Sequence, residues 1–215
     1  MVFEIRPPSD TDEQGRRIVE ATLRIVARYG LAKLTLDDVA REAGCSRATL
    51  YRRFPGKTVL LEAVVASESA RLQSGLDAAL AEVGTLADAM AAVAAFGAHE
   101  FENHAALQFL LAYEPGAVLP HVTFAGADRL LELLAGSVAP HLGRFMPGIQ
   151  AKRAGEWLAR IVLSYGCTPL DPRVQAALGD GPEATVVSIV RDFVAPAFAA
   201  EASRESGESG EEADD

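Results

Sequence analysis

The eight residues from 46 to 53 carry the side chains with the clearest chemistry in this chain. Arg47, Arg52 and Arg53 offer guanidinium groups, whose paired N–H donors match a phosphate group or the edge of a guanine base. Thr49 adds a hydroxyl group that can donate or accept. Donors of this kind at this density favour recognition of a nucleic acid by hydrogen bonding.

The residues around this cluster predict two short helices joined by a tight turn. Thr35 with a carboxylate three residues later resembles a capping box with Asp in place of Glu, which starts a helix over Leu36–Ala43. Gly44 stops that helix, and Ser46 can cap a second helix over Arg47–Phe54. Two short helices joined by three or four residues that include Gly form the helix-turn-helix geometry.

The second of these helices presents an outer face. Leu50 and Phe54 are four residues apart, so both are expected to pack inward against the first helix. A helix of this kind fits a DNA major groove, which is about 12 Å wide, with its early residues against base edges. The residues expected on or near the outer face are Arg47, Ala48, Thr49, Arg52 and Arg53.

A longer run around these helices carries a family resemblance. It reads Leu34-Thr-Leu-Asp-Asp-Val-Ala-Arg-Glu-Ala-Gly-Cys-Ser-Arg-Ala-Thr-Leu-Tyr-Arg-Arg-Phe-Pro-Gly-Lys-Thr-Val-Leu-Leu, and with the preceding helix that ends at Gly30 it resembles the DNA-binding signature of the TetR family. The resemblance covers residues 14–64 and departs at Cys45, where an aliphatic residue is more usual. It implies a dimeric transcriptional regulator, a repressor with a helix-turn-helix head and a helical body that binds a small molecule.

Carried over by position, the resemblance assigns DNA contacts to nine residues. The hydroxyls of Thr35 and Tyr51 would bind backbone phosphate, and Lys57 would add charge beside the N–H groups that open the next helix. Arg47 or Arg53 paired with guanine would discriminate between bases by roughly 1–3 kcal/mol. The expected DNA-binding residues are Thr35, Ser46, Arg47, Ala48, Thr49, Tyr51, Arg52, Arg53 and Lys57.

Simpler roles remain open for several of these residues. Thr35 and Ser46 are expected to cap helices in any case. Tyr51 could be a core residue that exposes only its hydroxyl, and Arg52 and Arg53 could belong to an ordinary solvated face. Whether those two arginines contact bases or phosphates also stays open.

The distribution of charge agrees with a DNA-binding head. The chain has a net charge of −10, but residues 1–57 hold eleven Arg or Lys against eight Asp or Glu, a net charge of +3. Residues 58–200 have a net charge of −7 and residues 201–215 one of −6. A weakly basic head can bind DNA locally, while an acidic body discourages diffuse binding.

Breaks at Pro and Gly divide the chain into four predicted parts. These are a loose arm (1–11), a helix-turn-helix DNA-binding domain (12–57), a ligand-binding and dimerisation domain (58–200) and a disordered acidic tail (201–215). A helix is expected from about Thr11 to Tyr29 and a long amphipathic helix from Lys57 to about Leu80. Pro120 and Pro140 are among the expected breaks. Further helices are expected at about 85–102, 104–113, 121–140, 149–166 and 182–199. The predicted fold class is all-α, with about nine helices.

The body is rich in large apolar side chains. An apolar or amphipathic effector is therefore preferred, although the same residues also serve as ordinary core. The candidate ligand-binding residues are Phe96, Phe101, Phe109, Tyr113, Phe124, Trp157 and Tyr165.

Two helices of the body are the candidate dimer interface. Two copies of Gln150–Tyr165 and Glu183–Phe198 would build a four-helix bundle, and the dimer would read a near-palindromic operator. Their apolar stripes are Ala154, Trp157, Leu158, Ile161 and Tyr165 on one helix and Val186, Ile189, Val190, Phe193 and Val194 on the other.

Other function classes find little support. No apolar run reaches the roughly 20 residues that a membrane-spanning helix needs. The four histidines lack the spacing of a zinc motif, and no nucleophile elbow, phosphate loop or dinucleotide fingerprint is present. We therefore expect a cytoplasmic protein that is not an enzyme and has no metal or cofactor. A small-molecule binding or interaction protein with a vestigial DNA head is the alternative, and an activator role stays open.

Overall fold

The computed structural model describes residues 13–168, 171, 173–175 and 181–201. Over these residues the chain forms eleven helical segments and no strand, which confirms the predicted all-α fold with somewhat more segments than the nine expected. The expected arm, and the expected tail apart from its first residue, lie outside the described residues. No helix among the described residues is long and apolar enough to cross a membrane.

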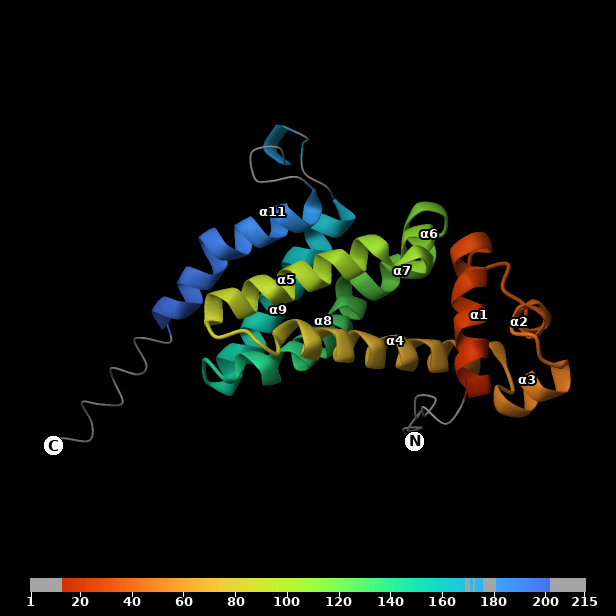
Figure 1. Ribbon diagram of the computed structural model, residues 1–215. Helices are drawn as coiled ribbons and strands as arrows, with labels where there is room; N and C mark the ends of the chain where they lie inside the picture. The colour runs from red at the N-terminus through yellow and green to blue at the C-terminus, as the bar shows by residue number, and fades with distance from the viewer. Residues whose placement is uncertain (1–12, 169–170, 172, 176–180, 202–215) are drawn as a thin grey trace. The chain divides into compact units, whose positions relative to one another are not determined.

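Contacts divide the described residues into two units. The head unit combines the residues up to Ser74 with His104–Pro120, and the body unit combines Gly75–Asn103 with the residues from His121 onward. Each unit has a separate hydrophobic core. The first three helices of the head unit lie together (Figure 1, red to orange). Its helices are α1 (Glu13–Tyr29), α2 (Leu36–Glu42), α3 (Arg47–Arg53), α6 (Ala105–Tyr113), most of α4 (Lys57–Leu80) and most of α7 (Pro115–Val122).

A small apolar core fixes the angle between the head helices. Ile18 of α1, Val39 of α2, Leu50 of α3 and Leu60 of α4 have no exposed surface. Each buried side chain of this size contributes about 1.5–3 kcal/mol through burial. Phe54, which follows α3, is also buried, so the prediction that Leu50 and Phe54 anchor this helix is confirmed.

The ends of the head helices follow the local sequence closely. Gly30 ends α1 with φ of +83° and Gly44 follows α2 with φ of +64°, a backbone region that costs glycine little. The side chain of Thr35 accepts a hydrogen bond from the Asp38 N–H, and that of Ser46 accepts one from the Thr49 N–H. The predicted helix bounds and caps of the helix-turn-helix are therefore confirmed to within a residue.

The loop between α1 and α2 is held by two charged side chains. The carboxylate of Glu114, the residue that ends α6, accepts hydrogen bonds from the N–H groups of Leu31 and Ala32 at 2.9 and 3.1 Å. The Lys57 ammonium donates to the Leu31 carbonyl oxygen at 2.7 Å. A Cβ atom at Gly30 would overlap the Glu114 carboxylate, so the close approach also requires glycine. This Glu114–Lys57 clamp ties the start of α2 to α6 and α4.

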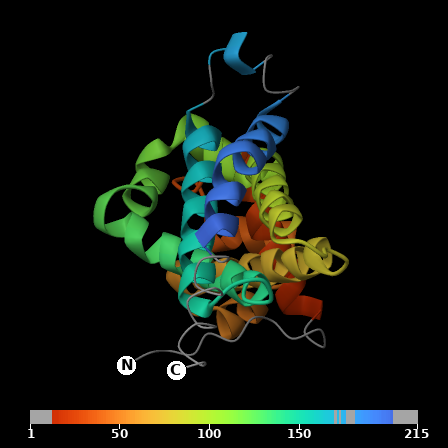
Figure 2. The same ribbon diagram turned by 90° about the vertical axis from the view of Figure 1, so that its left-hand side faces the viewer.

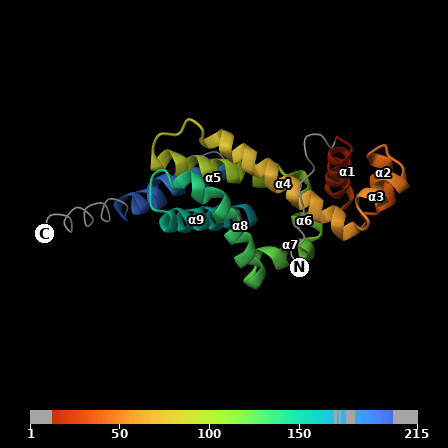
Figure 3. The same cartoon turned by 90° about the horizontal axis from the view of Figure 1, so that it is seen from below.

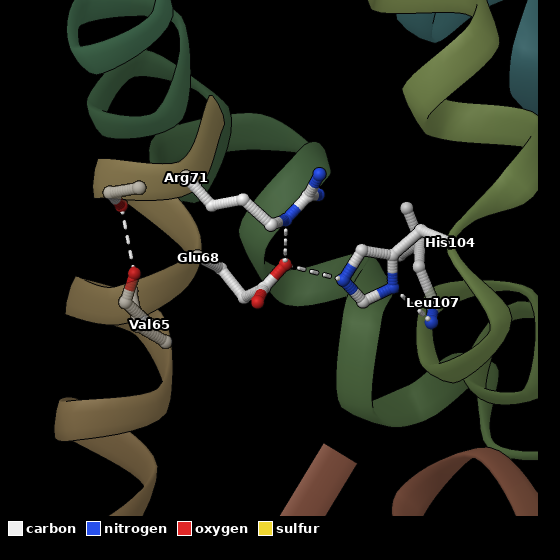
Figure 4. Close-up of polar contacts among 6 residues, drawn as sticks. Val65, Glu68, Arg71, His104 and Leu107 are labelled. Carbon is white, nitrogen blue, oxygen red and sulfur yellow. Dashed lines mark hydrogen bonds and ion pairs between the residues drawn. The ribbon is translucent and has the colours of Figure 1, made fainter. Parts of the chain in front are cut away.

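A histidine holds the other end of α6. Figure 4 shows His104, the N-cap of α6, facing Glu68 of α4. The Nδ1 atom of His104 accepts the Leu107 N–H at 3.1 Å, and its Nε2 atom lies 3.2 Å from the Glu68 carboxylate. Because Nδ1 accepts, the proton of the neutral ring is on Nε2 and is donated to Glu68. This hydrogen bond, with one from Arg71 at 3.0 Å, lowers the pKa of Glu68 against the opposing effect of burial.

The body unit packs its helices around α9 (Gly148–Cys167). Figure 3 shows α9 beside α8 (Phe124–Leu142) and α5 (Leu86–Asn103). A Cβ atom on Gly155 would lie 3.1 Å from the Ala135 carbonyl oxygen, so glycine permits the close approach of α9 to α8. The last described helix is α11 (Pro182–Ile189), which continues through a π-helical segment, η1 (Val190–Val194), to Glu201.

Two prolines were wrongly predicted to break helices. Pro120 lies inside α7, a helix that was not expected. Pro140 lies inside α8, which corresponds to the helix predicted for residues 121–140 but begins at Phe124. A proline ring clashes with the carbonyl four residues earlier, and that residue is Gly116 for Pro120 and Gly136 for Pro140. Glycine has more backbone freedom than other residues to adjust to this clash.

Replacing Glu114 tests the clamp on the α1–α2 loop. Glu114→Gln removes the charge from two hydrogen bonds, so we expect local opening at Leu31 and Ala32 to become easier by about 1.5 kcal/mol. The measurement is amide hydrogen exchange at these two residues. Glu132→Gln, which alters an exposed surface pair with Lys152, is the control and should leave both amides protected. Equal exchange in Glu114→Gln and the unmodified chain would contradict the clamp.

The Glu68–His104 contact predicts a pH dependence of stability. Because the pKa of Glu68 is lower in the folded chain than in the unfolded chain, its contribution is present above about pH 4.3 and is lost as the pH falls through the folded pKa. We expect the difference in free energy of unfolding between the unmodified chain and Glu68→Gln to shrink below about pH 4.3. Urea unfolding between pH 3 and pH 6 measures it. Parallel curves for the two proteins would refute the assignment. The lowered pKa values of Glu13 and Asp38 affect both proteins alike.

Candidate nucleic-acid interface

The outer face of α3 is open to solvent. Arg47, Ala48, Arg52 and Arg53 are exposed, and Thr49 is half-buried. Tyr51 is 48% exposed, so its ring is not part of the head core. The predicted orientation of the helix is confirmed, because Leu50 packs inward while these side chains point away from the core.

The hydroxyl groups at the helix starts already have partners within the head. Thr35 donates to the Asp38 carboxylate at 2.5 Å, and this hydrogen bond lowers the pKa of Asp38. Ser46 lies 2.9 Å from the Thr49 hydroxyl. The Thr35 hydroxyl would therefore have to turn away from Asp38 to donate to a DNA phosphate, whereas Ser46 and Thr49 can exchange roles as donor and acceptor.

Each of the three carboxylates of α2 has a cationic partner. Asp37 pairs with Arg47 of α3 at 2.8 Å, and Asp38 pairs with Arg41 at 2.8 Å. Glu42 pairs with Arg24 of α1 at 2.9 Å. These pairs are exposed, so their individual contribution to stability is small. They do neutralise the acidic groups that lie next to the candidate DNA-reading helix.

Lys57 occupies a different environment from the arginines of α3. It is half-buried and its ammonium donates to the Leu31 carbonyl oxygen at 2.7 Å. Lys57 therefore has a structural role in the α1–α2 loop that the sequence did not suggest. It remains the first residue of α4, and the first N–H groups of a helix have no partner within that helix and can bind an anion.

The candidate ligand-binding residues fall into two separate groups. Phe96, Phe101 and Tyr165 pack within the body unit, where Phe101 covers Gly166 and Phe96 covers Gly75. The rings of Phe109 and Tyr113 contact each other in the head unit, with centroids 4.8 Å apart and an angle of 42° between their planes. Trp157 is 53% exposed on α9. The side chain of Phe124 lies outside the described residues. Their role in ligand binding stays a prediction.

The stripes expected at a dimer interface are divided between two environments. Four members, Ala154, Leu158, Val186 and Val190, are buried in the core of their own unit, so including them in an interface was wrong. They face inward because α5, α8, α9 and α11 pack against one another there. Trp157 and Phe193 are 53% and 71% exposed, as is expected of interface residues.

Three polar partners were missed by the sequence reasoning. The acid at Asp37 is already explained by its place in the first turn of α2, where a helix dipole favours negative charge, so nothing pointed to Arg47 ten residues later. Glu114 and Glu68 lie far in sequence from the groups that they bind, and no local pattern connects them.

Within the described residues, no group of three or more His, Cys, Asp or Glu is placed to hold a metal ion.

Comparison with known proteins finds one family whose sequence model matches this head. A sequence model described as bacterial regulatory proteins, tetR family, matches residues 18–64, from α1 into α4. These are the residues that build the head core and the exposed face of α3. Over these residues the chain is therefore similar to the bacterial regulatory proteins of the tetR family.

Curated relatives match in two ways. The HTH-type transcriptional regulator SrpR of Pseudomonas putida is 37% identical over 65 residues, which is 30% of each chain. TtgW, an uncharacterized HTH-type regulator of the same species, is 37% identical over 65 residues, and this match covers 48% of its length. The chain thus spans less than half of these two relatives. An uncharacterized HTH-type regulator of Mycobacterium tuberculosis is 26% identical over 204 residues, covering 94% of this chain and 95% of the relative.

Solved structures share the fold over most of the chain. The TetR family repressor AlkX from a Dietzia strain aligns with a TM-score of 0.61 and 21% identity, covering 86% of this chain and 95% of AlkX. The regulator FadR from Bacillus subtilis, solved with stearoyl-CoA, aligns with a TM-score of 0.57 and 16% identity, covering 83% of this chain and 98% of FadR. These alignments support the all-helical fold of the chain.

Proposed function

We propose that this chain is a sequence-specific DNA-binding transcriptional regulator that reads operator DNA with α3. The observation that carries the proposal is the exposed face of α3, on which Arg47, Tyr51, Arg52 and Arg53 project from a helix anchored by Leu50. A helix held in this way can enter a major groove as a rigid element. The family match over residues 18–64 supports the same reading.

Repression that is relieved by a small effector is the form of regulation that we propose. An effector releases DNA only if it binds the DNA-incompetent state more tightly than the competent one. Two fold neighbours are connected with aliphatic compounds: AlkX is implicated in the biodegradation of n-alkanes, and FadR was solved with stearoyl-CoA. They support an apolar or amphipathic effector here. Stearoyl-CoA that leaves the protein–DNA complex unchanged in a retention assay would count against this class.

We propose that the regulator acts as a homodimer through α9 and the helix that contains η1. In Figure 2 these two helices (teal and blue) lie side by side. They carry the exposed aromatic residues Trp157 and Phe193. Exposed aromatic side chains of this size are enriched in the buried centre of protein interfaces. A symmetric dimer would place two heads on successive faces of a near-palindromic operator.

Removing one hydroxyl group tests the DNA contact of Tyr51. Tyr51→Phe keeps the ring, so folding should be unaffected, and the loss of a phosphate hydrogen bond should weaken DNA binding about 5- to 10-fold on all sequences alike. Fluorescence anisotropy with duplex DNA at fixed salt measures the affinity. Tyr29→Phe, the same change at an exposed tyrosine of α1, is the matched control. Equal affinities for all three proteins would exclude the contact, and uniformly weak binding of the unmodified chain to every duplex would refute the proposed function.

Introducing a charge tests the dimer interface. Trp157→Glu should shift the chain toward monomer, because a charge placed in the centre of an apolar interface is costly to desolvate. Sedimentation velocity gives the oligomeric state, and far-UV circular dichroism confirms the fold. Val65→Glu, at a valine of α4 that is 65% exposed, is the control. An unchanged dimer in Trp157→Glu would exclude this surface.

A further inference from the structure

We propose that Asp37 is a positioning residue that sets the DNA sequence specificity of the head by orienting Arg47. The proposal rests on the proposed function and deepens it, because it names a residue that would govern how one base pair is read. Asp37 lies in the first turn of α2, and Arg47 is the first residue of α3. Asp37 Oδ2 and Arg47 Nη2 are 2.8 Å apart.

The position of Arg47 makes an external partner necessary. The first turn of a helix carries the positive end of the helix dipole and exposed N–H groups, which repel a guanidinium group. No acidic residue of α3 lies in that turn to offset the repulsion. Asp37, from the preceding helix, provides the negative charge. The side chain of Arg47 is 71% exposed while that of Asp37 is 39% exposed, so most of the guanidinium surface faces solvent with one nitrogen held.

A guanidinium group held at one nitrogen is well suited to read a base. The guanidinium group is planar, and the ion pair with Asp37 limits where that plane lies, which favours donation of two hydrogen bonds to guanine O6 and N7. Holding the side chain before binding also reduces the entropy that is lost when the complex forms. The pair is weak in water because both groups are exposed, but it strengthens when a groove wall excludes solvent.

The carboxylate of Asp37 also affects non-specific binding to DNA. A negative charge beside the reading helix repels DNA phosphates on every sequence, so it lowers the affinity for non-operator DNA. On operator DNA this loss is offset by the contact that the oriented Arg47 makes. Both effects of Asp37 therefore increase the discrimination between operator DNA and other DNA. The other acids of α2 have only the second effect, because Asp38 pairs with Arg41 and Glu42 with Arg24.

Glu42 supplies a matched control for this reason. It lies on the same helix, its side chain is 33% exposed and its partner Arg24 belongs to α1 and not to α3. Asp37→Asn and Glu42→Gln each remove one negative charge from α2 and keep the shape of the side chain. General attraction to DNA should therefore increase about equally in both variants, and a difference in sequence discrimination isolates the effect on Arg47.

The experiment uses the full chain and duplex DNA. The preferred sequence is first selected from randomised duplexes with the unmodified protein. Affinities are then measured by fluorescence anisotropy for that sequence, for its single base-pair variants and for an unrelated duplex. The proteins are the unmodified chain, Asp37→Asn, Glu42→Gln, Arg47→Ala and the double variant Asp37→Asn/Arg47→Ala. Thermal unfolding of each protein verifies the fold, and Asp37→Glu serves as a conservative variant that keeps the charge.

We expect Asp37→Asn to lose about tenfold in discrimination at one base pair of each half-site, the same pair at which Arg47→Ala loses discrimination. Glu42→Gln and Asp37→Glu should retain most of it. In the Arg47→Ala background, Asp37→Asn should change discrimination no further. Affinity for the unrelated duplex should increase by a similar factor in Asp37→Asn and Glu42→Gln.

Three results would overturn the proposal. Unchanged discrimination in Asp37→Asn shows that Arg47 reads DNA without help from Asp37. A loss that persists when Arg47 is absent shows that Asp37 acts by another route. Selection of no sequence by the unmodified chain overturns the proposed function together with this inference, and this result is recognised before any variant is made.

Discussion

The carboxylate of Glu114 anchors the loop between α1 and α2, and the placement of α2 and α3 depends on that loop. In the loop that follows α1, this one side chain accepts hydrogen bonds from the N–H groups of Leu31 and Ala32. The same stretch of loop offers its Leu31 carbonyl oxygen to Lys57. The start of α2 follows directly, and the turn after α2 then sets α3. The orientation of the outer face of α3 therefore depends on a contact from α6, outside the helix-turn-helix itself.

Charge is arranged on two length scales in this molecule. Over the whole chain the net charge of −10 repels DNA at a distance, and salt screens this repulsion beyond about 10 Å. Close to α3, the acids Asp37, Asp38 and Glu42 each have an arginine partner within 3 Å. The local field is consequently less negative than a count of acids suggests. An acidic protein with a neutralised head can bind selectively, since general attraction contributes little to its affinity.

Local signals in the sequence predicted the head accurately because its helices begin and end for local reasons. Thr35, Ser46 and Gly30 act within four residues of themselves, so the bounds of the helix-turn-helix could be predicted. Pro140 was misread because it lies within the last turn of α8, which ends only at Leu142. Contacts between distant segments, such as that of His104 with Glu68, could not be predicted from one sequence. The division of the dimer stripes also escaped prediction, because an apolar period does not show which face meets the core of its own unit.

Specificity and stability draw on the same polar groups in this head. The Thr35 hydroxyl stabilises the start of α2 and is also an expected phosphate contact. Lys57 likewise holds the α1–α2 loop and is also an expected DNA contact. A DNA phosphate that takes either donor must replace a hydrogen bond already present, so only the difference between the two bonds adds to affinity. Tyr51 and Arg52 are exposed and face no such competition in any contact described for them. Under the proposed function, the net gain in affinity would therefore come mainly from the exposed face of α3, while the capping residues would contribute by fixing where that face lies.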